Sequence, residues 1–431
     1  MSPETVSTKL ARIARQSKQN PAMVFTTLAH QMDEGFLTEA FYQLRKDAAA
    51  GIDEMTAAEY QVNLGERIAD LHSRLVRGEY RAQPARRVWI PKGDGGQRPL
   101  AILVLEDKIV QRAVAMILEA IYEPYFYEFS FGFRRYFSAH GALIYVRQQC
   151  LKLGINWIID ADIRKFFDTI SWEQLRAILQ KRVNDGAILR LIGMWLHVGV
   201  LEAGQVVNQE LGTPQGAPIS PILANIFLHV VLDEWFQTQV RPRMGGDCFL
   251  ARYADDFVMG FSSKSDAEKV FGVLPKRFER FGLSIHPDKS RLVQFSRPYW
   301  KRGKGPGTFT FLGFTHYWAK TLNGGWTIKR KTQNKRLSRF LSGIGDWCKK
   351  HLHEPLAEQH RQLSAKLRGH YEYYGVRGNF KMLEVAYEHT RAAWKKWLGR
   401  RNSKNRMSWE RFMEQVEATQ PLPLPRIIHP F

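Results

Sequence analysis

The chain has few cysteines and no long hydrophobic run. Its three cysteines, Cys150, Cys248 and Cys348, lie far apart, and no two form a C-x-x-C pair. This spacing argues against a structural zinc site and a disulfide framework, and it fits a reducing compartment. No stretch approaches the ~18 apolar residues of a membrane span, and the polar, basic start lacks the apolar core of a signal peptide. We therefore expect a cytoplasmic protein.

Internal repeats and low-complexity tracts are also missing, which excludes a solenoid and a disordered chain. The 431 residues are 44% hydrophobic and 12% aromatic, as in a folded protein of two or three packed units. Basic residues outnumber acidic ones by 63 to 42, which gives a net charge of +21. Such an excess suits a polyanionic partner held along an extended surface, although a basic protein kept soluble by its charge is the plainer alternative.

Hydrophobic patterning predicts an α+β body followed by a basic helical region, with the change near residues 300–320. A turn cluster at 91–96 follows the short apolar run Val88–Ile90 and predicts a hairpin. Helical spacing begins at Asp107 and ends at Ile121. Further strands are expected at Trp157–Ile159, Phe249–Tyr253, Phe257–Met259 and Phe309–Tyr317, with helices from Leu337 and an extended tail at Pro421–Pro425.

Three aspartates are candidates for metal binding. Asp162 follows an apolar strand, and the adjacent pair Asp255-Asp256 separates two apolar strands. Neighbouring carboxylates repel one another, and divalent cations relieve that repulsion; oxygen ligands alone favour magnesium or manganese. Two such ions can activate a primer hydroxyl and stabilise a leaving pyrophosphate. The alternative for Asp255-Asp256 alone is an ordinary β-turn, in which Asp is common.

A series of motifs follows one another along most of the chain. In chain order, the motifs are GIDEMT at 51–56, IPKGDGGQRPL at 90–100, FGFRRYFSAH at 131–140, DIRKFFD at 162–168, GTPQGAPISPILANIFL at 212–228, RYADDF at 252–257, GLSIHPDKSRL at 282–292 and FLGF at 311–314. From about residue 20 to about 415, this series resembles the reverse transcriptases, in particular those of bacterial group II introns, whose metal-binding signature is the tetrad YADD on a hairpin. The series also resembles domesticated, defence-associated relatives of those enzymes.

The resemblance implies an α+β right-hand polymerase with fingers, an antiparallel palm sheet and a helical thumb. It implies two Mg²⁺ ions, or Mn²⁺, as cofactors. Asp162 and Asp255 are then the direct ligands, Asp256 supports them, and the backbone carbonyl of Ile163 helps to hold the second ion. The expected domains are a basic N-terminal helical extension at 1–50, fingers and palm at 51–300, primer grip and thumb at 301–415, and an extended tail at 416–431.

The resemblance also implies a nucleotide site. Phe167 corresponds to the aromatic position that excludes a 2′-hydroxyl, although core packing beside Phe166 would also explain it. Gln215 would position the template base and the nucleotide. Lys92 and Arg98 would hold the triphosphate, and the alternative for both is a solvated turn. Lys289 would lie near the pyrophosphate as a general acid, or be a plain surface lysine.

Nucleic-acid contacts are expected from three segments. Leu312 and Gly313 belong to the motif that resembles the primer grip. Aromatic and cationic residues alternate in the helical region at 363–383, which suits stacking and phosphate contacts, although part of the aromatics would form the thumb core. His370 has no Cys or His at ligand spacing and is not a metal candidate. The residues predicted to bind nucleic acid are Arg134, Arg135, His140, Leu312, Gly313, Lys366, Arg368, Tyr373 and Arg377.

Two departures from the family pattern leave the biological role open. Arg135-Tyr136-Phe137 replaces a stretch that usually reads Pro-Gly-Arg, and Ala217-Pro218 replaces a more usual second glycine. No Cys- and His-bearing endonuclease motif follows the helical region, so cutting of a DNA target is not expected. The expected partners are a structured RNA, a DNA or RNA primer and dNTPs, with no membrane.

Four functions remain under consideration. The first is an intron-encoded reverse transcriptase, and the second is a domesticated enzyme that copies a partner non-coding RNA in antiphage defence. The third is a non-catalytic RNA-binding splicing maturase, against which the intact acids argue. The fourth, an RNA-dependent RNA polymerase, fits YADD and Phe167 less well. Oligomeric state is not predicted.

Overall fold

The computed structural model describes residues 4–91, 96–202, 205–207, 212, 216–298, 306–401 and 407–431. The chain forms two compact units, each built from separate stretches of sequence. The first unit combines residues 1–142, 161–259 and 265–291, and the second combines 143–160, 260–264 and 292–431. Across the described residues, no helix is both long and apolar enough to cross a membrane.

The first unit begins with helices that pack around α5 (Leu105–Tyr122). The sequence predicted this helix with one apolar face, but the structure buries it on nearly all sides. Two earlier helices, α1 and α2, lie against it, and Thr5 and Asp33 cap their N-termini through side-chain oxygens. The N-terminal helices are α1 (Val6–Gln19), the 3₁₀ turn η1 (Ala29–Gln31), α2 (Glu34–Gln43), α3 (Ala57–Val62) and α4 (Leu64–Val76).

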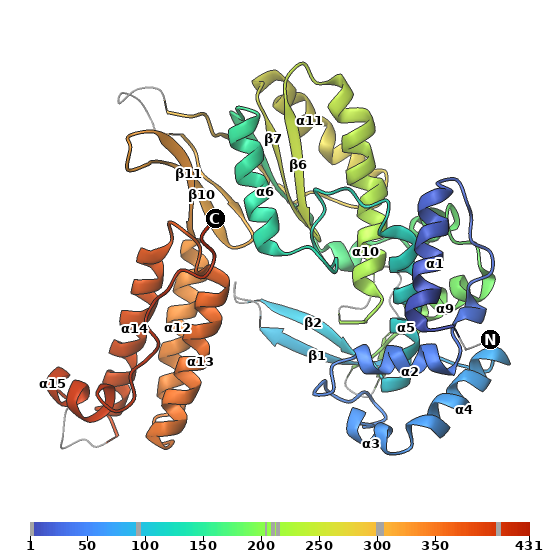
Figure 1. Ribbon diagram of the computed structural model, residues 1–431, viewed down its shortest axis with the longest axis horizontal. Coiled ribbons are helices and arrows are strands. Elements are labelled where there is room, and N and C mark those ends of the chain that lie inside the picture. Colours follow the sequence, from blue (N-terminus) through green and yellow to red (C-terminus); the bar gives the residue numbers. More distant parts are fainter. Residues whose placement is uncertain are drawn as a thin grey trace. The chain divides into compact units, whose positions relative to one another are not determined.

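The hairpin predicted at the 91–96 turn cluster is confirmed by its two paired strands. Strand β1 (Ala85–Pro91) pairs antiparallel with β2 (Gln97–Ile102), from Arg86 opposite Ile102 to Pro91 opposite Gln97. β4 (Val200–Glu202) adds to β1 in parallel and β5 (Gln205–Val207) adds to β4, so the strand order is β2-β1-β4-β5. Figure 1 shows β1 and β2 as a two-stranded projection. The turn residues 92–95 lie outside the described residues.

A second sheet has the order β6-β7-β3-β8. Its strands are β6 (Cys248–Tyr253), β7 (Asp256–Phe261), β3 (Trp157–Asp162) and β8 (Arg291–Gln294). β6 and β7 are buried along almost their whole length, which explains why both read as continuous apolar runs rather than as alternating patterns. Helix α11 (Lys264–Glu279) lies beside this hairpin (Figure 1). The Phe278 ring of α11 stacks on the Phe257 ring of β7.

Other helices of the first unit connect the sheet strands. One long helical stretch starts as α10 and continues through π-helical and 3₁₀ segments, so its hydrogen-bond pattern changes along its length. These elements are α7 (Phe166–Thr169), α8 (Trp172–Gln180), α9 (Gly186–His197), α10 (Ser220–Leu228), η2 (His229–Glu234), η3 (Phe236–Val240) and η4 (Arg241–Arg243). Helix α6 (Ala139–Lys152) runs from the first unit into the second.

The second unit joins a small sheet to a helical bundle. β9 (Phe309–Phe311), β10 (Phe314–Lys320) and β11 (Trp326–Thr332) form an antiparallel sheet of order β11-β10-β9. Helices α12 (Asn334–Lys350), α13 (Leu356–Tyr374) and α14 (Phe380–Leu398) then lie side by side (Figure 1). They are followed by α15 (Trp409–Phe412) and the π-helical η5 (Met413–Glu417).

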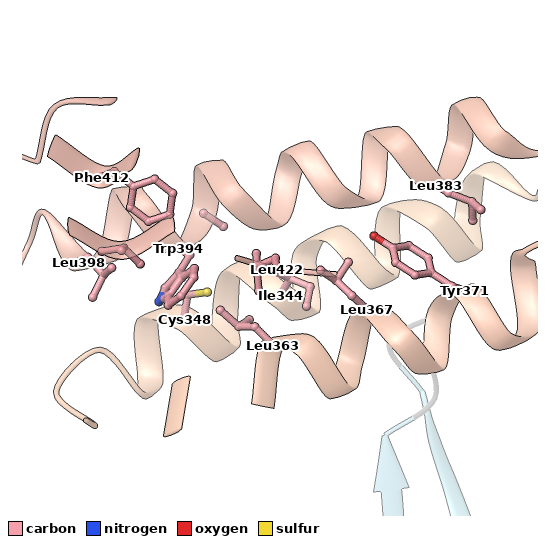
Figure 2. Close-up of a cluster of buried hydrophobic side chains, with 12 residues drawn as sticks. Ile344, Cys348, Leu363, Leu367, Tyr371, Leu383, Trp394, Leu398, Phe412 and Leu422 are labelled. Carbon is pink, nitrogen blue, oxygen red and sulfur yellow. The ribbon is translucent and has the colours of Figure 1, made fainter. Parts of the chain in front are cut away.

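The bundle has its own apolar core. Figure 2 shows Trp394, Leu398 and Phe412 at one end of this core and Tyr371 and Leu383 at the other. Leu422 of the extended C-terminal segment also enters it, and the Tyr371 hydroxyl donates to the Pro423 carbonyl at 3.2 Å. The extended segment therefore belongs to the folded bundle.

All three cysteines are buried and unpaired. Burial raises the pKa of the Cys150 thiol well above its ordinary value, that of Cys248 to about 11 and that of Cys348 to about 12. The expected absence of a disulfide framework therefore agrees with three separate thiols in the interior.

Candidate active site

The predicted acidic residues lie at the ends of neighbouring strands. Asn156, just before β3, donates its backbone N–H to the Phe261 carbonyl at the end of β7. The start of β3 therefore meets the end of β7, so the two strands run antiparallel. Counted six residues along from this pair, the same register sets Asp162, the last residue of β3, opposite Asp255, the turn residue just before β7.

Asp162 is held by the 284–290 segment. The Ser290 hydroxyl accepts from the Asp162 N–H at 3.2 Å, and the Asp162 carbonyl accepts from the His286 N–H at 2.8 Å. The Lys289 ammonium lies 3.2 Å from the Asp162 carboxylate. The two motifs that contain Asp162 and Lys289 therefore meet, and the carboxylate already has a positive charge beside it.

Asp255 and Asp256 follow a strained residue. Ala254 has φ +57°, in the left-handed region that residues with a Cβ seldom adopt. It links β6 to β7, and both acids are half-buried. A tight turn thus carries the adjacent acids, as the sequence predicted for the hairpin tip.

A buried ionic network lies beneath this turn. Arg252 and Asp233 are both fully buried, and Arg252 Nε donates to Asp233 Oδ1 at 2.8 Å. Arg252 Nη1 donates to the Ala254 carbonyl at 3.1 Å and to Asn225 Oδ1 at 2.9 Å, and Nη2 donates to the Ser130 hydroxyl at 2.7 Å. Burial alone would raise the pKa of Asp233, but the charge and hydrogen bonds of Arg252 outweigh it and hold that pKa below its ordinary value.

The 129–132 segment closes over the same turn. Arg252 donates its N–H to Phe129 and accepts from Phe131, both at 2.8 Å. A Cβ on Gly132 would lie 2.3 Å from the Ala254 nitrogen, so only glycine permits this approach. Asn225 Nδ2 donates to the Gly132 carbonyl at 2.8 Å. Three motifs far apart in sequence therefore meet at the turn.

The glycines on either side of Gln215 lie at close approaches to other segments. Gly212 has φ +91°, and a Cβ there would lie 2.6 Å from the Phe167 carbonyl. Gly216 has φ +105°, and a Cβ there would lie 2.8 Å from the Leu100 side chain on β2. Phe167 is half-buried and meets Phe166 edge-on at a centroid distance of 5.2 Å.

Several predicted nucleotide contacts lie beyond what the structure describes. Lys92 and Gln215 are outside the described residues. Arg98 is on β2, opposite Ile90 of β1, but its side chain is outside them. Ile163 is buried next to Asp162, bridged to Ile285 of the segment that carries Lys289.

The described residues form no closed metal cluster. In the part of the chain that the structure describes, no three or more His, Cys, Asp or Glu side chains are grouped so that they could hold a metal ion. Asp162 is ion-paired with Lys289 instead. The carboxylate oxygens are nevertheless the kind of ligand that magnesium and manganese prefer. The ion pair with Lys289 also shows that the Asp162 carboxylate attracts positive charge.

In the second unit, the FLGF motif forms the turn between β9 and β10. Leu312 and Gly313 have φ of +51° and +77°. The Tyr373 hydroxyl donates to the Leu312 carbonyl at 2.9 Å, and a Cβ on Gly313 would lie 3.0 Å from the Tyr374 hydroxyl. Helix α13 therefore supports this turn from one side.

The basic residues predicted to bind nucleic acid differ in their surroundings. In the second unit, Arg368 and Arg377 are exposed, and Lys366 is half-buried with its ammonium over the Trp347 ring. In the first unit, Arg135 is exposed and stacks on Tyr136, and His140 is half-buried. These positions are compatible with the prediction, which stays a prediction.

Arg134 serves the fold instead. Its side chain is 6% exposed and ion-paired with Glu123, and its guanidinium donates to the Tyr127 and Ser130 carbonyls at 2.8 and 2.6 Å. It also packs over the Phe137 ring. The sequence could not separate this inward arginine from its exposed neighbour, because both belong to one basic motif.

The sequence reasoning missed Arg252, Asp233 and Asn225. Two of them had a detectable signal, since Arg252 interrupts an apolar strand and Asp233 lies in the apolar stretch VVLDEWF. A charge inside a buried run is costly unless it is paired, so each implied a partner. Nothing local indicated that they were partners of one another.

Comparison with known proteins identifies the class. A family model described as "Reverse transcriptase (RNA-dependent DNA polymerase)" matches residues 90–316, which contain the acids, the network and the FLGF turn. The chain belongs to this reverse transcriptase family. The predicted right-hand polymerase fold, with an antiparallel palm sheet, is thereby confirmed.

Individual relatives narrow the class further. The chain is 32% identical over 275 residues to "Protein YkfC" of Escherichia coli, covering 56% of this chain and 71% of the relative. It is 36% identical over 225 residues to "Group II intron-encoded protein LtrA" of Lactococcus lactis, covering 51% of this chain and 37% of the relative. It is 37% identical over 271 residues to "Putative COX1/OXI3 intron 1 protein" of Saccharomyces cerevisiae, covering 52% and 32%.

The family model and the similarity to a group II intron-encoded protein identify the chain as a group II intron-like reverse transcriptase, as its motifs indicated. The chain spans only about a third of the length of the last two relatives. Activities of the whole relatives therefore do not pass to this chain by similarity alone.

Proposed function

We propose that this protein synthesises DNA on an RNA template, by adding dNTPs to the 3′-hydroxyl of a primer. The observation that carries the proposal is the antiparallel register of β3 and β7, which sets Asp162 opposite Asp255 at the ends of adjacent strands. Carboxylates converging at one sheet edge suit phosphoryl-transfer chemistry, in which positioning and charge stabilisation provide most of the rate.

Asp162, Asp255 and Asp256 would hold the magnesium ions, with the Ile163 carbonyl as an additional ligand. Two bound ions would supply an activated primer hydroxyl and charge neutralisation on the leaving pyrophosphate. Because Lys289 pairs with Asp162, a divalent cation would compete with that ammonium for the carboxylate. Lys289 would then be available to give a proton to the pyrophosphate.

Other residues would bind and orient the substrates. Lys92 and Arg98 would contact the triphosphate, and Gln215 the nascent base pair. Leu312 and Gly313 would support the primer end. Lys366, Arg368, Tyr373 and Arg377 in the helical region, with Arg135 and His140 in the first unit, would contact the nucleic acid through phosphate and stacking interactions.

The decisive experiment measures extension of an oligo(dT) primer on poly(rA) by the full chain with dTTP and Mg²⁺. Wild-type protein should extend the primer, and Asp255→Asn with Asp256→Asn should lower the rate at least about 1,000-fold, equivalent to about 4 kcal/mol of barrier. Binding of the primed template should survive. The matched control is Asp53→Asn with Glu54→Gln, an adjacent acidic pair in an exposed turn, also with a positive φ at Glu54.

The control pair should polymerise at the wild-type rate. Synthesis that persists in Asp255→Asn with Asp256→Asn would remove these residues from the mechanism. Lack of synthesis by the wild-type protein, on this and on other primed RNAs, would favour the non-catalytic splicing maturase.

Phe167 is proposed to exclude ribonucleotides. Its side chain is half-buried and its backbone carbonyl lies at the close approach of Gly212, and replacing the ring with alanine would open space next to the sugar. Phe167→Ala should raise the efficiency of rNTP incorporation relative to dNTP about 10-fold or more in primer extension. Unchanged discrimination would leave Phe167 as a packing residue only, and Phe166→Leu, a change at the buried neighbour, controls for loosened packing.

The proposed RNA partner is an intron RNA, because relatives of this chain are named for introns. Sequencing of the RNA and cDNA that copurify with the protein from its native host tests this. Intron RNA with cDNA that runs into flanking exons supports the mobile-intron role. A short non-coding RNA with cDNA confined to it would favour the defence role instead.

A further inference from the structure

We propose that Arg252 is a positioning residue for DNA synthesis, which orients the turn bearing Asp255 and Asp256 from inside the protein. The inference rests on the proposed polymerase function and deepens it. The Arg252 side chain is fully buried, so it contacts neither nucleotide nor template. Any effect on the reaction must pass through the backbone it holds.

The hydrogen bonds of Arg252 connect the turn to fixed points in the core. Two guanidinium nitrogens bind the Asp233 carboxylate, and Nη1 binds the Ala254 carbonyl at 3.1 Å. Asn225 and Ser130 accept the remaining bonds at 2.9 and 2.7 Å. Because a guanidinium is planar and rigid, fixing it on Asp233 also fixes the direction of the bond to Ala254.

The turn needs such support because Ala254 is in the left-handed region. A residue with a Cβ stays at a φ of +57° only when its surroundings hold it there. Arg252 holds the carbonyl of Ala254, and Gly132 packs against its nitrogen. Relaxation of Ala254 would rotate the peptide that leads into Asp255 and move its carboxylate away from Asp162.

Asn225 joins the two supports. Its oxygen accepts from Arg252, and its amide nitrogen donates to the Gly132 carbonyl. The arginine below the turn and the segment above it are therefore one connected network. A substitution at Asn225 should disturb the turn without leaving a charge unpaired.

The test is Arg252→Lys in the full chain, assayed by primer extension on poly(rA)/oligo(dT). Lysine keeps the positive charge beside Asp233, but its single nitrogen lacks the rigid planar fork by which separate guanidinium nitrogens reach Asp233 and the Ala254 carbonyl in fixed directions. We expect kcat to fall about 10- to 100-fold, since small misplacements of reacting groups have effects of that size. The Mg²⁺ concentration for half-maximal rate should rise several-fold, while KM for primed template should stay within about 2-fold of wild type.

The matched control is Arg391→Lys. Arg391 forms a two-pronged pair with Glu417 in the second unit, so this change perturbs a similar ion pair that has no contact with Ala254. Rates are compared at temperatures where both variants are fully folded. If Arg252→Lys only lowers the melting temperature, and its kcat and Mg²⁺ dependence match those of Arg391→Lys, the positioning role is overturned.

A second variant covers the case in which Arg252→Lys does not fold. Asn225→Ala leaves the Arg252–Asp233 pair intact and should lower kcat about 3- to 10-fold with the same rise in Mg²⁺ requirement. Wild-type kinetics in Asn225→Ala would contradict the connected network.

Binding of Mn²⁺, followed by electron paramagnetic resonance, gives a reading that does not depend on activity. Arg252→Lys should weaken Mn²⁺ binding several-fold relative to wild type and Arg391→Lys, and equal binding in all three would overturn the inference. Failure of the wild-type protein to synthesise DNA would refute the proposed function and the inference with it. An active wild type with an equally active Arg252→Lys would refute the inference alone.

Discussion

Arg252 and Arg330 are both buried, one in each unit, but their surroundings differ. Arg252 lies in β6 and is paired with the buried carboxylate of Asp233. Arg330 lies in β11 and donates Nη2 to the Phe431 carbonyl at 2.7 Å, while its Nε and Nη1 have no hydrogen-bond partner. Its register neighbour on β10, His316, is also buried, with neither ring nitrogen hydrogen-bonded.

The titration behaviour of the two sites follows from this difference. Burial, together with the smaller effect of the positive charge of nearby Arg147, lowers the pKa of Arg330 to about 10. Burial, with the charge of Arg330, lowers the pKa of His316 to about 3. Near Arg252, by contrast, the charges compensate each other, and Asp233 stays ionised. A satisfied buried charge fixes geometry, whereas an unsatisfied one mainly costs stability.

The largest expected effect is at Asp233. Asp233→Ala would leave the Arg252 cation buried without its carboxylate, and the free energy of unfolding should fall by about 3–5 kcal/mol. Urea unfolding of the full chain measures this. As a control, Asp247→Ala removes an exposed carboxylate just before β6 and should change the free energy of unfolding by less than about 1 kcal/mol. Similar losses of unfolding free energy in Asp233→Ala and Asp247→Ala would contradict the conclusion that Asp233 compensates the buried charge of Arg252.

Acid should destabilise the protein through His316. In the unfolded chain its imidazole takes up a proton below its ordinary pKa of 6.5, but in the folded protein only near pH 3. Between these values the unfolded state binds more protons, so the free energy of unfolding falls by about 1.4 kcal/mol per pH unit as the pH drops. His316→Phe keeps a ring against Phe309 and should be less sensitive to pH by about that slope.

The His316 prediction is checked by urea unfolding of both proteins from pH 7 to 5. Burial also lowers the pKa of His370, to about 4. Because both proteins contain His370, its contribution to the pH dependence is the same in both and cancels in the comparison. Equal pH slopes would mean that His316 is hydrated or paired in solution.

The smallest expected effect is at Arg330. Arg330→Met replaces a poorly satisfied cation with an apolar side chain of similar length, and the free energy of unfolding should be unchanged or rise by about 1 kcal/mol. Loss of the bond to Phe431 offsets part of the gain. Arg252→Met should lower the free energy of unfolding by about 3 kcal/mol, because it leaves the buried Asp233 carboxylate without its cation. Equal losses for the two methionine variants would remove the distinction between the regions.

The sequence predicted the strands next to the acids because its signals there are local. Apolar runs separated by Ala254-Asp255-Asp256 predicted the β6–β7 hairpin, and the turn residues after Pro91 predicted the β1–β2 hairpin. Both patterns depend on neighbours in the chain. The assignment of metal and nucleotide roles depended instead on resemblance to a family, and those roles stay predictions.

The parts that were not predicted depend on distant contacts. Arg252 and Asp233 pair across helix and strand, and no periodicity indicates which buried charge meets which. Arg134 turns inward toward Glu123 although its motif suggested nucleic-acid contact. Helix α5 is buried on nearly all sides because other helices cover its second face, a tertiary effect that its own pattern did not contain.

The burial of all three cysteines makes this chain suitable for site-specific labelling. Thiol reagents attack the thiolate, and burial both shields these sulfurs and raises their pKa. A maleimide dye should therefore react with cysteines introduced at exposed positions, such as Tyr136 in the first unit and Leu322 in the second, and spare the native thiols. A donor and acceptor dye at these two positions would report movement between the units, by single-molecule energy transfer, as primed template binds.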